Sequence, residues 1–276
     1  MNRTDLALES VSASKHTDSG LHHGQGGTLK KSRVNGMALT EIDLEQNNPL
    51  NKPAGSYATL TCALRDEKNE IEALFKVLKG FIPEDGRILV AGLGNANITP
   101  DSLGVRAAAR TLATAHLSES REFKELEMRE VYVVETGVLA QTGMESGEQL
   151  KFITAGIKPD MAVVIDSLAC SETERLGRTI QVTDTGIAPG SGVGNSRREV
   201  SKKSLGIPVV AVGVPTVIDL SAIAPHIAKS RNPYEAMVVP RDIDVVINHF
   251  AKIISKSLNR ILIPSLSDEE IEKLRF

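Results

Sequence analysis

The chain has 276 residues, of which 41% are hydrophobic and 3% aromatic, enough for one large domain with a core of aliphatic side chains. Charged residues make up 24% and the formal net charge is -3, so no excess of positive charge exists to neutralise phosphates. This balance argues against a nucleic-acid-binding protein.

The N-terminal part differs in composition from the rest of the chain. Residues 10–55 are rich in Ser, His, Gly, Asn and Lys, and the run from His22 to Gly27 is typical of a flexible loop. Within this part, the segment 34–44 predicts one peripheral strand. We therefore divide the chain into a flexible or peripheral segment, 1–55, and a single α/β domain, 56–276.

A regular spacing of apolar residues begins at the start of the segment 56–276. Apolar residues alternate with others over 57–64, which predicts a half-buried strand. The next segment has the i, i+3, i+4, i+7 spacing of an amphipathic helix that Gly80 would end. Its apolar positions are Ile71, Leu74, Phe75 and Leu78.

Continuous apolar runs then alternate with helical patterns. The runs are of the kind found in strands covered on both faces, and they cover 88–91, 131–134, 161–165 and 208–212. Helical patterns near 102–117 and 142–157 lie between them, as in right-handed βαβ crossovers. Ile180 and Val182 predict a further strand, and 243–258 a long amphipathic helix. The alternation predicts a three-layer α/β/α sandwich.

Two segments that come directly after predicted strands contain aspartates. Ligands of open α/β sheets bind at the carboxyl ends of strands, which makes both segments candidate sites. The first, 92–104, contains Asp101, and a plain strand–turn–helix connection capped by Thr99 or Asp101 explains it equally well. The second contains Asp166, directly after the run 161–165. A carboxylate there is costly unless it is hydrogen-bonded or used, but many such residues only cap a helix.

A third segment, 183–195, is rich in glycine. Its backbone N–H groups could converge on an anion or on a substrate backbone, although a plain loop is the alternative. It lacks the Gly-Lys-Ser/Thr ending of a P-loop, so a nucleotide triphosphate is not expected. The glycines are Gly186, Gly190, Gly192 and Gly194.

Other sites and locations are disfavoured. No Gly-x-Ser-x-Gly motif occurs, and the six histidines form no spaced metal motif, so we expect neither a metal nor another cofactor. Cys62 and Cys170 are too few for a disulfide framework, and Cys170 is typical of a small apolar filler. No apolar run approaches the roughly 18 residues that cross a bilayer, which predicts a cytoplasmic protein without membrane contact.

Together these segments resemble the germination protease (spore protease) family of spore-forming Firmicutes, most densely over 87–220. The matching words are Arg3-Thr4-Asp5-Leu6-Ala7, Gly92-Leu93-Gly94-Asn95, Thr99-Pro100-Asp101, Ile165-Asp166-Ser167-Leu168-Ala169, Asp184-Thr185-Gly186-Ile187, Gly194-Asn195, Leu205-Gly206-Ile207-Pro208-Val209 and Gly213-Val214-Pro215-Thr216-Val217.

The resemblance implies an endopeptidase that initiates the degradation of small acid-soluble spore proteins during germination, in the forespore or spore core. It implies a homotetramer and a phosphorylase/hydrolase-like fold similar to hydrogenase-maturation peptidases. The family's two catalytic aspartates fall on Asp101 and Asp166. The residues expected to bind substrate are Gly92, Asn95, Gly186, Gly190, Gly192 and Gly194.

The resemblance also implies an inactive precursor that trims its own N-terminus. The segment Thr4–Glu9 resembles such a site, with the scissile bond between Asp5 and Leu6. On this basis the segment 1–55 includes a propeptide, and 56–276 is the catalytic domain. Residues 221–236 replace a longer helical segment of the family.

A two-aspartate mechanism is the expected consequence of these assignments. Two carboxyls that face one water resist being charged together, so one keeps a proton. The ionised one would activate the water, the protonated one would polarise the carbonyl, and amides of 186–194 would stabilise the oxyanion or hold the substrate. Two alternatives remain: a nickel-dependent hydrogenase-maturation-type peptidase, and a non-catalytic anion-binding α/β module.

Overall fold

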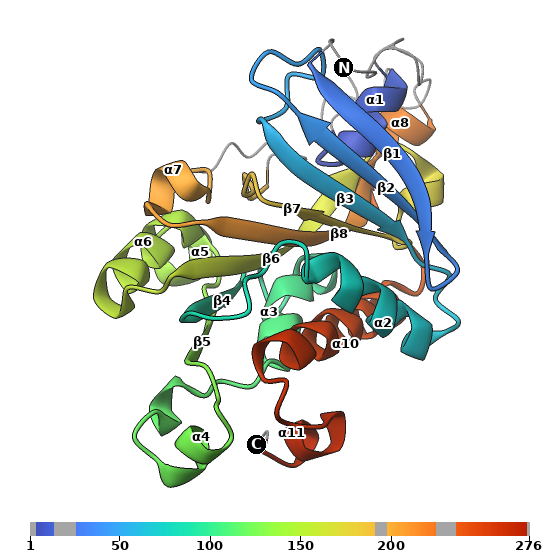
Figure 1. The fold of residues 1–276 in the computed structure, drawn as a ribbon. Helices are drawn as coiled ribbons and strands as arrows, with labels where there is room; N and C mark the ends of the chain where they lie inside the picture. The colour runs from blue at the N-terminus through green and yellow to red at the C-terminus, as the bar shows by residue number, and fades with distance from the viewer. Residues whose placement is uncertain (1–3, 14–25, 191–197, 225–235, 275–276) are drawn as a thin grey trace.

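A mixed β-sheet runs through the computed structural model, which describes residues 4–13, 26–190, 198–224 and 236–274 (Figure 1). The strand order is β1-β2-β3-β7-β8-β6-β4-β5, and β9 pairs with β8. The strands are β1 (Gly27–Val34), β2 (Met37–Leu44), β3 (Gly55–Thr61), β4 (Ile88–Gly92), β5 (Val131–Glu135), β6 (Met161–Cys170), β7 (Thr179–Thr183), β8 (Val209–Asp219) and β9 (Met237–Val238).

Helices surround this sheet, and the short ones include three 3-10 turns. The α-helices are α1 (Ala7–Ala13), α2 (Glu67–Leu78), α3 (Leu103–Ala108), α4 (Arg121–Glu125), α5 (Leu139–Thr142), α6 (Ser146–Ile157), α7 (Lys202–Leu205), α8 (Leu220–Ile223), α10 (Ile243–Leu262) and α11 (Asp268–Leu274). The 3-10 helices are η1 (Thr99–Asp101), η2 (Ala115–Leu117) and η3 (Thr173–Arg175).

Two apolar clusters separate the layers and confirm the three-layer prediction. On one face of the sheet, α2, α3 and α10 pack against the central strands, with Phe250 fully buried among them. On the other face, Leu150 of α6 and Leu205 of α7 pack against β4, β6 and β8. Figure 1 shows these helices on opposite sides of the sheet.

The sheet is parallel in one half and antiparallel in the other. The four continuous apolar runs form β4, β5, β6 and β8, which pair in parallel. In the other half, β1, β2, β3 and β7 pair antiparallel, and β7 also runs antiparallel to β8. The segment 34–44 contains the strand predicted there, β2, but β1 comes before it and was not predicted, and the two strands form a hairpin. Asn35 and Gly36 supply the positive φ angles of 46° and 82° that its two-residue turn requires.

Strand β3 is buried on both faces, although its alternating pattern predicted only one buried face. Ala58 and Leu60 face the main core. On the other side Tyr57 packs with Ala7 and Val11 of α1. The N-terminal helix therefore covers a surface that the alternation predicted to be solvated. The loop predicted from His22 to Gly27 lies largely outside the described residues.

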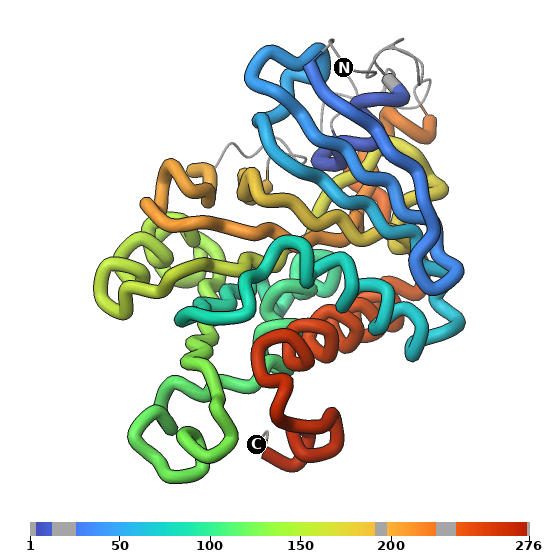
Figure 2. Tube along the Cα trace, viewed as in Figure 1, coloured from blue at the N-terminus to red at the C-terminus, as the bar shows by residue number. Residues whose placement is uncertain are grey.

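The two long amphipathic helices form as predicted, but two others are interrupted. The pattern at 102–117 yields only α3, because the Asn259 side chain on α10 accepts from Leu112 N (3.0 Å) and donates to Arg110 O (3.1 Å). The pattern at 142–157 is broken at Gly143, whose φ of 73° ends α5. Figure 2 shows the chain between α3 and β5 leaving the sheet as a separate loop.

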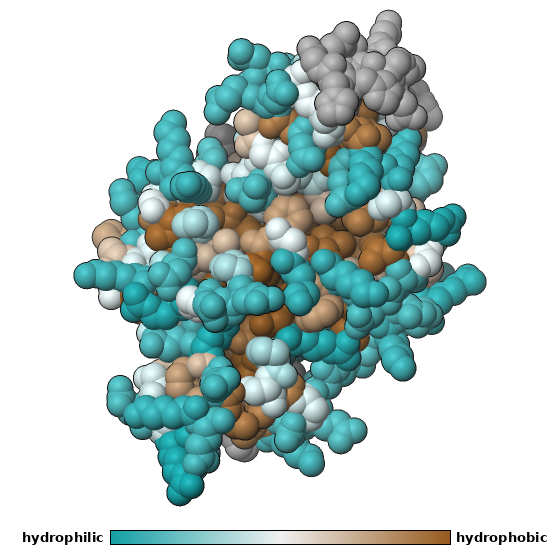
Figure 3. Space-filling view, in the orientation of Figure 1, coloured by the Kyte–Doolittle hydropathy of each residue, from teal (hydrophilic) through white to brown (hydrophobic). Residues whose placement is uncertain are grey.

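The surface is mostly hydrophilic at its periphery, with hydrophobic residues gathered toward the middle of the view in Figure 3. None of the helices in the described ranges is long and apolar enough to cross a membrane.

Candidate active site

Asp101 and Asp166 line the same pocket, which has a volume of about 430 Å³. Asp166 is 4% exposed, whereas Asp101 is partly exposed. A third carboxyl, that of Asp5, lines the same pocket. Apolar residues complete the walls, among them Leu93, Ile98, Pro100, Val217, Met237 and Val239. Three carboxyl groups thus share a largely apolar pocket, where the dielectric is lower than in water.

Asp166 reaches this pocket from inside a strand, not from its end. The predicted strand end at 165 was wrong, because β6 continues to Cys170 beside the similarly long β8. Strand β4 does end at Gly92, which pairs with Ile165, so Asp166 lies one position beyond the carboxyl end of its neighbour. Its Oδ1 accepts a hydrogen bond from Ser167 N at 2.8 Å.

Asp101 is the last residue of η1, in the loop after β4. The loop is closed by backbone bonds from Asn95 N to Asp101 O (2.9 Å) and from Asp101 N to Ile98 O (2.8 Å). Gly94 has a φ of 108°, and a Cβ there would collide with the Asp101 carbonyl. The glycine is required for the turn that brings Asp101 back toward β6.

The residues predicted to bind substrate divide into three groups. Gly190 lines the aspartate pocket, and Gly186 lines a second pocket beside it. Gly92 and Asn95 line neither, and a Cβ on Gly92 would collide with the Gly104 carbonyl, so Gly92 permits α3 to approach β4 closely. The last two glycines, at 192 and 194, lie outside the described residues.

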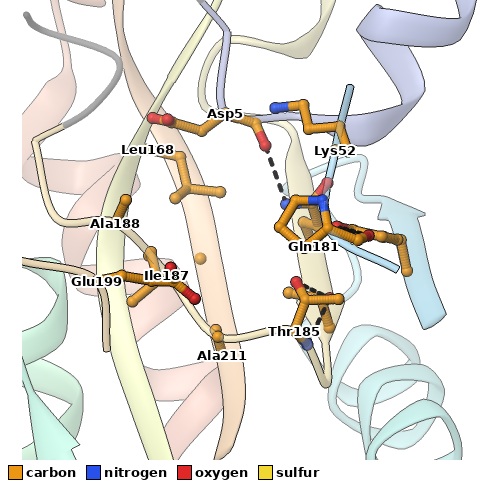
Figure 4. A pocket seen from close by; sticks show the side chains of 14 residues that line it. Asp5, Lys52, Leu168, Gln181, Thr185, Ile187, Ala188, Glu199 and Ala211 are labelled. Atoms are coloured by element: carbon orange, nitrogen blue, oxygen red, sulfur yellow. Dashed lines mark hydrogen bonds between the residues drawn. The ribbon is translucent and has the colours of Figure 1, made fainter. Parts of the chain in front are cut away.

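A second pocket, with a volume of about 180 Å³, is shown in Figure 4. It shares Asp5 and Leu168 with the aspartate pocket. Its polar lining includes Lys52, Tyr57, Gln181, Thr185 and Glu199. Asp5 therefore contributes to the walls of both cavities.

The N-terminal segment is docked between these pockets. Asp5 N donates to Ala169 O at 3.0 Å, and Ala169 N donates to the Asp5 carboxylate at 2.8 Å. Leu6 is fully buried with Leu168 and Cys170. Lys52 Nζ donates to Thr4 O at 3.0 Å. Both sides of the predicted scissile bond are thus held against β6.

Glu9 anchors the start of α1. Its carboxylate is almost fully buried and accepts from Ser171 N and Oγ, both at 2.7 Å, and from Glu172 N at 3.0 Å. Arg175 Nε lies 3.8 Å from the same carboxylate. Backbone donors and a cation together offset the cost of burying this charge.

Burial changes the titration of three groups near the docked segment. It lowers the pKa of Lys52, although Asp5 and Glu9 act in the opposite direction. It raises the pKa of Tyr57 to about 12 and that of the Cys170 thiol to about 12. Cys170 is therefore a thiol at neutral pH, which agrees with its assignment as an apolar filler.

The candidate metal ligands are few. Within the ranges that the structure describes, no three His, Cys, Asp or Glu side chains are grouped so that they could hold a metal ion.

Three residues that contact the docked segment were missed in the sequence. Lys52 lies in a segment assigned as peripheral, and Ser171 comes after the predicted site. Gln181 interrupts the apolar alternation between Ile180 and Val182. A buried polar residue within a strand was the available signal, but its partners lie near the other end of the chain.

Comparison with known proteins identifies one matching family and several relatives. The germination protease model matches residues 4–229. The germination proteases of Caldanaerobacter subterraneus subsp. tengcongensis and Clostridium tetani are 34% and 35% identical over 99% and 98% of this chain, and 97% and 98% of their own length is covered. That of Bacillus mycoides is 38% identical over 80% of this chain and 64% of its own.

One solved structure, the [NiFe] hydrogenase maturation protease HycI from Thermococcus kodakarensis, is also similar. It has 20% identity and a TM-score of 0.39, and the match covers 67% of this chain and 97% of that one.

Proposed function

The chain belongs to the germination protease family and is an endopeptidase of spore germination, and on this basis we propose which residues cleave the peptide bond. Asp101 and Asp166 are the catalytic pair. One observation carries the proposal: both aspartates line one pocket together with Asp5, whose bond to Leu6 is the expected processing site.

The pair acts on a water in this pocket. Two carboxyls in one apolar pocket favour a state in which one is protonated and the other ionised. The ionised aspartate takes a proton from water as the water oxygen attacks the scissile carbonyl carbon. The protonated aspartate then delivers its proton to the leaving amine, and the carbon–nitrogen bond breaks. Either aspartate can take either role.

We further propose that the protein is made as a precursor whose first cleavage falls between Asp5 and Leu6. The docking of this bond beside the aspartate pocket supports the proposal. Only Met1 to Asp5 would leave. The rest of the segment 1–55 would stay as the peripheral part of the catalytic domain, because β1 and β2 belong to the same sheet as the core strands.

The substrates, location and assembly are proposed from family membership. The substrates would be small acid-soluble spore proteins, cleaved in the cytoplasm of the spore core, and the assembly would be a homotetramer. An acidic residue before the cut and an apolar residue after it would be preferred, as in the chain's own Asp5 and Leu6.

Intact-mass spectrometry of the purified full chain tests the catalytic pair. We expect the wild-type protein, incubated at mildly acidic and at neutral pH, to lose residues 1–5. Asp101→Asn and Asp166→Asn should remain intact while folding normally, and Asp85→Asn, which changes an exposed carboxyl, should be processed like the wild type. Processing of either pocket variant at the wild-type rate would refute the two-aspartate mechanism.

A further inference from the structure

We propose that Gln181 is a third catalytic residue, whose side-chain amide stabilises the negative charge that develops on the scissile carbonyl oxygen. This inference rests on the proposed function, in which the bond between Asp5 and Leu6 is cleaved from the aspartate pocket. It assigns to a side chain on β7 the stabilisation that the glycine-rich loop was expected to provide.

The Gln181 amide spans the bond that is to be cut. Its Nε2 donates to Asp5 O, the carbonyl oxygen of that bond, at 3.3 Å, and its Oε1 accepts from Ala7 N at 2.8 Å. The orientation of the amide is fixed by chemistry, because a backbone N–H can only donate. The oxygen must therefore face Ala7, and the nitrogen must face the scissile carbonyl. Figure 4 shows this contact at the edge of the second pocket.

The amide is held in place before any reaction begins. Gln181 lies in the middle of β7, paired with Thr59 on β3 and with Gly213 on β8, and is only 6% exposed. Both ends of the amide are hydrogen-bonded. A donor fixed in this way needs little reorganisation when charge develops, which is the property that makes such donors effective.

The aspartates and Gln181 belong to different pockets that meet at the scissile residue. Asp101 and Asp166 line one of the two pockets that Asp5 lines, and Gln181 lines the other. When water attacks the carbonyl carbon, the electron pair of the C=O π bond moves onto the carbonyl oxygen. Gln181 donates to that oxygen while it is an anion. The electron pair on the oxygen then re-forms the C=O π bond as the carbon–nitrogen bond breaks. The amine of Leu6 takes its proton from the protonated aspartate.

The rate of self-cleavage of the full chain, followed by intact mass, tests this role. Gln181→Glu keeps an acceptor for Ala7 N but has no donor when ionised, and Gln181→Met keeps the approximate length without any hydrogen bond. Loss of one oxyanion donor should slow cleavage by about 10²–10³-fold at neutral pH.

Lys52→Met is the matched control for docking. Lys52 donates to Thr4 O, one residue before the scissile carbonyl, so its loss weakens docking without removing a donor from the reacting oxygen. Cleavage should slow by no more than about tenfold, which corresponds to one ordinary hydrogen bond. Thermal unfolding of each variant checks folding, and Gln181→Met decides the test if the buried charge of Gln181→Glu prevents folding.

The outcomes separate this inference from the proposed function. If both Gln181 variants cleave at the wild-type rate while Asp166→Asn does not cleave, Gln181 is not catalytic and the aspartate pair stands. If Lys52→Met slows cleavage as much as the Gln181 variants do, Gln181 acts only in docking, and its catalytic role is refuted. A wild-type chain that never loses residues 1–5 refutes both.

Discussion

Glu70 shows how a single buried carboxylate can organise a turn far from the active site. It is fully buried and accepts from Ala63 N (3.0 Å) and Leu64 N (2.8 Å), and His249 Nε2 lies 2.6 Å from it. Burial acts to raise the pKa of Glu70, but the hydrogen bond and charge of His249 and the two backbone N–H groups outweigh burial. The pKa of Glu70 is therefore below its ordinary value of 4.5.

This lowered pKa predicts how acid affects stability. A carboxyl with a depressed folded-state pKa stabilises the native state above its unfolded pKa, and this contribution is lost as the pH falls through the folded value. We expect Glu70→Gln to lower the free energy of unfolding by about 1–3 kcal/mol at pH 7. The difference from wild type should shrink as the pH falls below 4.5, as measured by urea denaturation. A difference that stays constant would contradict the assignment.

At the scale of elements, the junction of α3 with β4 and β6 positions Asp101. A Cβ on Gly104 would meet the carbonyl oxygens of Ile165 and Leu93, and would lie 2.6 Å from Leu93 N. These are backbone atoms and cannot turn aside. The helix that comes after η1 can therefore approach the two strands only with glycine at this position.

Gly104→Ala should push α3 away from the sheet. We expect the free energy of unfolding to fall by about 2–3 kcal/mol, the range of an overpacked core, and self-cleavage to slow as Asp101 moves. Gly156→Ala is the control, because nothing lies within 4 Å of its Cβ position on the exposed side of α6. It should raise stability by about 0.5–1 kcal/mol. Urea denaturation measures the free energy of unfolding of both variants. Equal changes in the two variants would show that the close approach of α3 to the sheet is not required.

The elements best predicted from sequence are those whose buried face can be recognised from the apolar pattern within the element itself. Helices α2 and α10 show their buried face in the spacing of apolar residues, and the parallel strands show burial on both faces as unbroken apolar runs. The end of α3 depends on Asn259, and the hydrogen bond from Gln181 to Asp5 joins residues 176 positions apart. The sequence around α3 or around Gln181 does not indicate a hydrogen-bond partner so far away in the chain.

The candidate site, like the fold, was predictable from the sequence only in part. The segments that contain Asp101 and Asp166 were candidate sites because ligands of open α/β sheets bind at the carboxyl ends of strands, and the family resemblance implied that these two aspartates form a pair. One pocket contains both. The position of Asp166 inside β6 was not predictable, since it depends on β8 continuing alongside. The docking of Asp5 required the tertiary structure.

At the scale of the whole molecule, the N-terminal segment joins the two halves of the sheet. Leu6 packs with Leu168 and Ile218 at the ends of β6 and β8. The next residue, Ala7, and Val11 one turn after it pack against β2 and β3. The residues after the predicted cut are therefore structural, whereas those before it contribute mainly hydrogen bonds.

Two truncations test this division. A chain that begins at Leu6 should lose about 2–3 kcal/mol of stability, because it lacks four partly exposed hydrogen bonds that join Thr4 and Asp5 to the rest of the chain. A chain that begins at Ser14 should lose on the order of 5 kcal/mol, because it also lacks the buried Leu6 and Val11 side chains. Thermal and urea unfolding measure both. Equal stability of the two truncated chains would show that the segment is not part of the fold.

Strand β1 also bears on how copies of the molecule can meet. It forms one edge of the sheet, paired on one side with β2, and its exposed side chains include Lys30, Lys31 and Arg33. Two such edges brought together would place like charges opposite one another, which is unfavourable. The sheet is thereby protected from growing across this edge into a polymer, and the homotetramer proposed above would have to form through other surfaces.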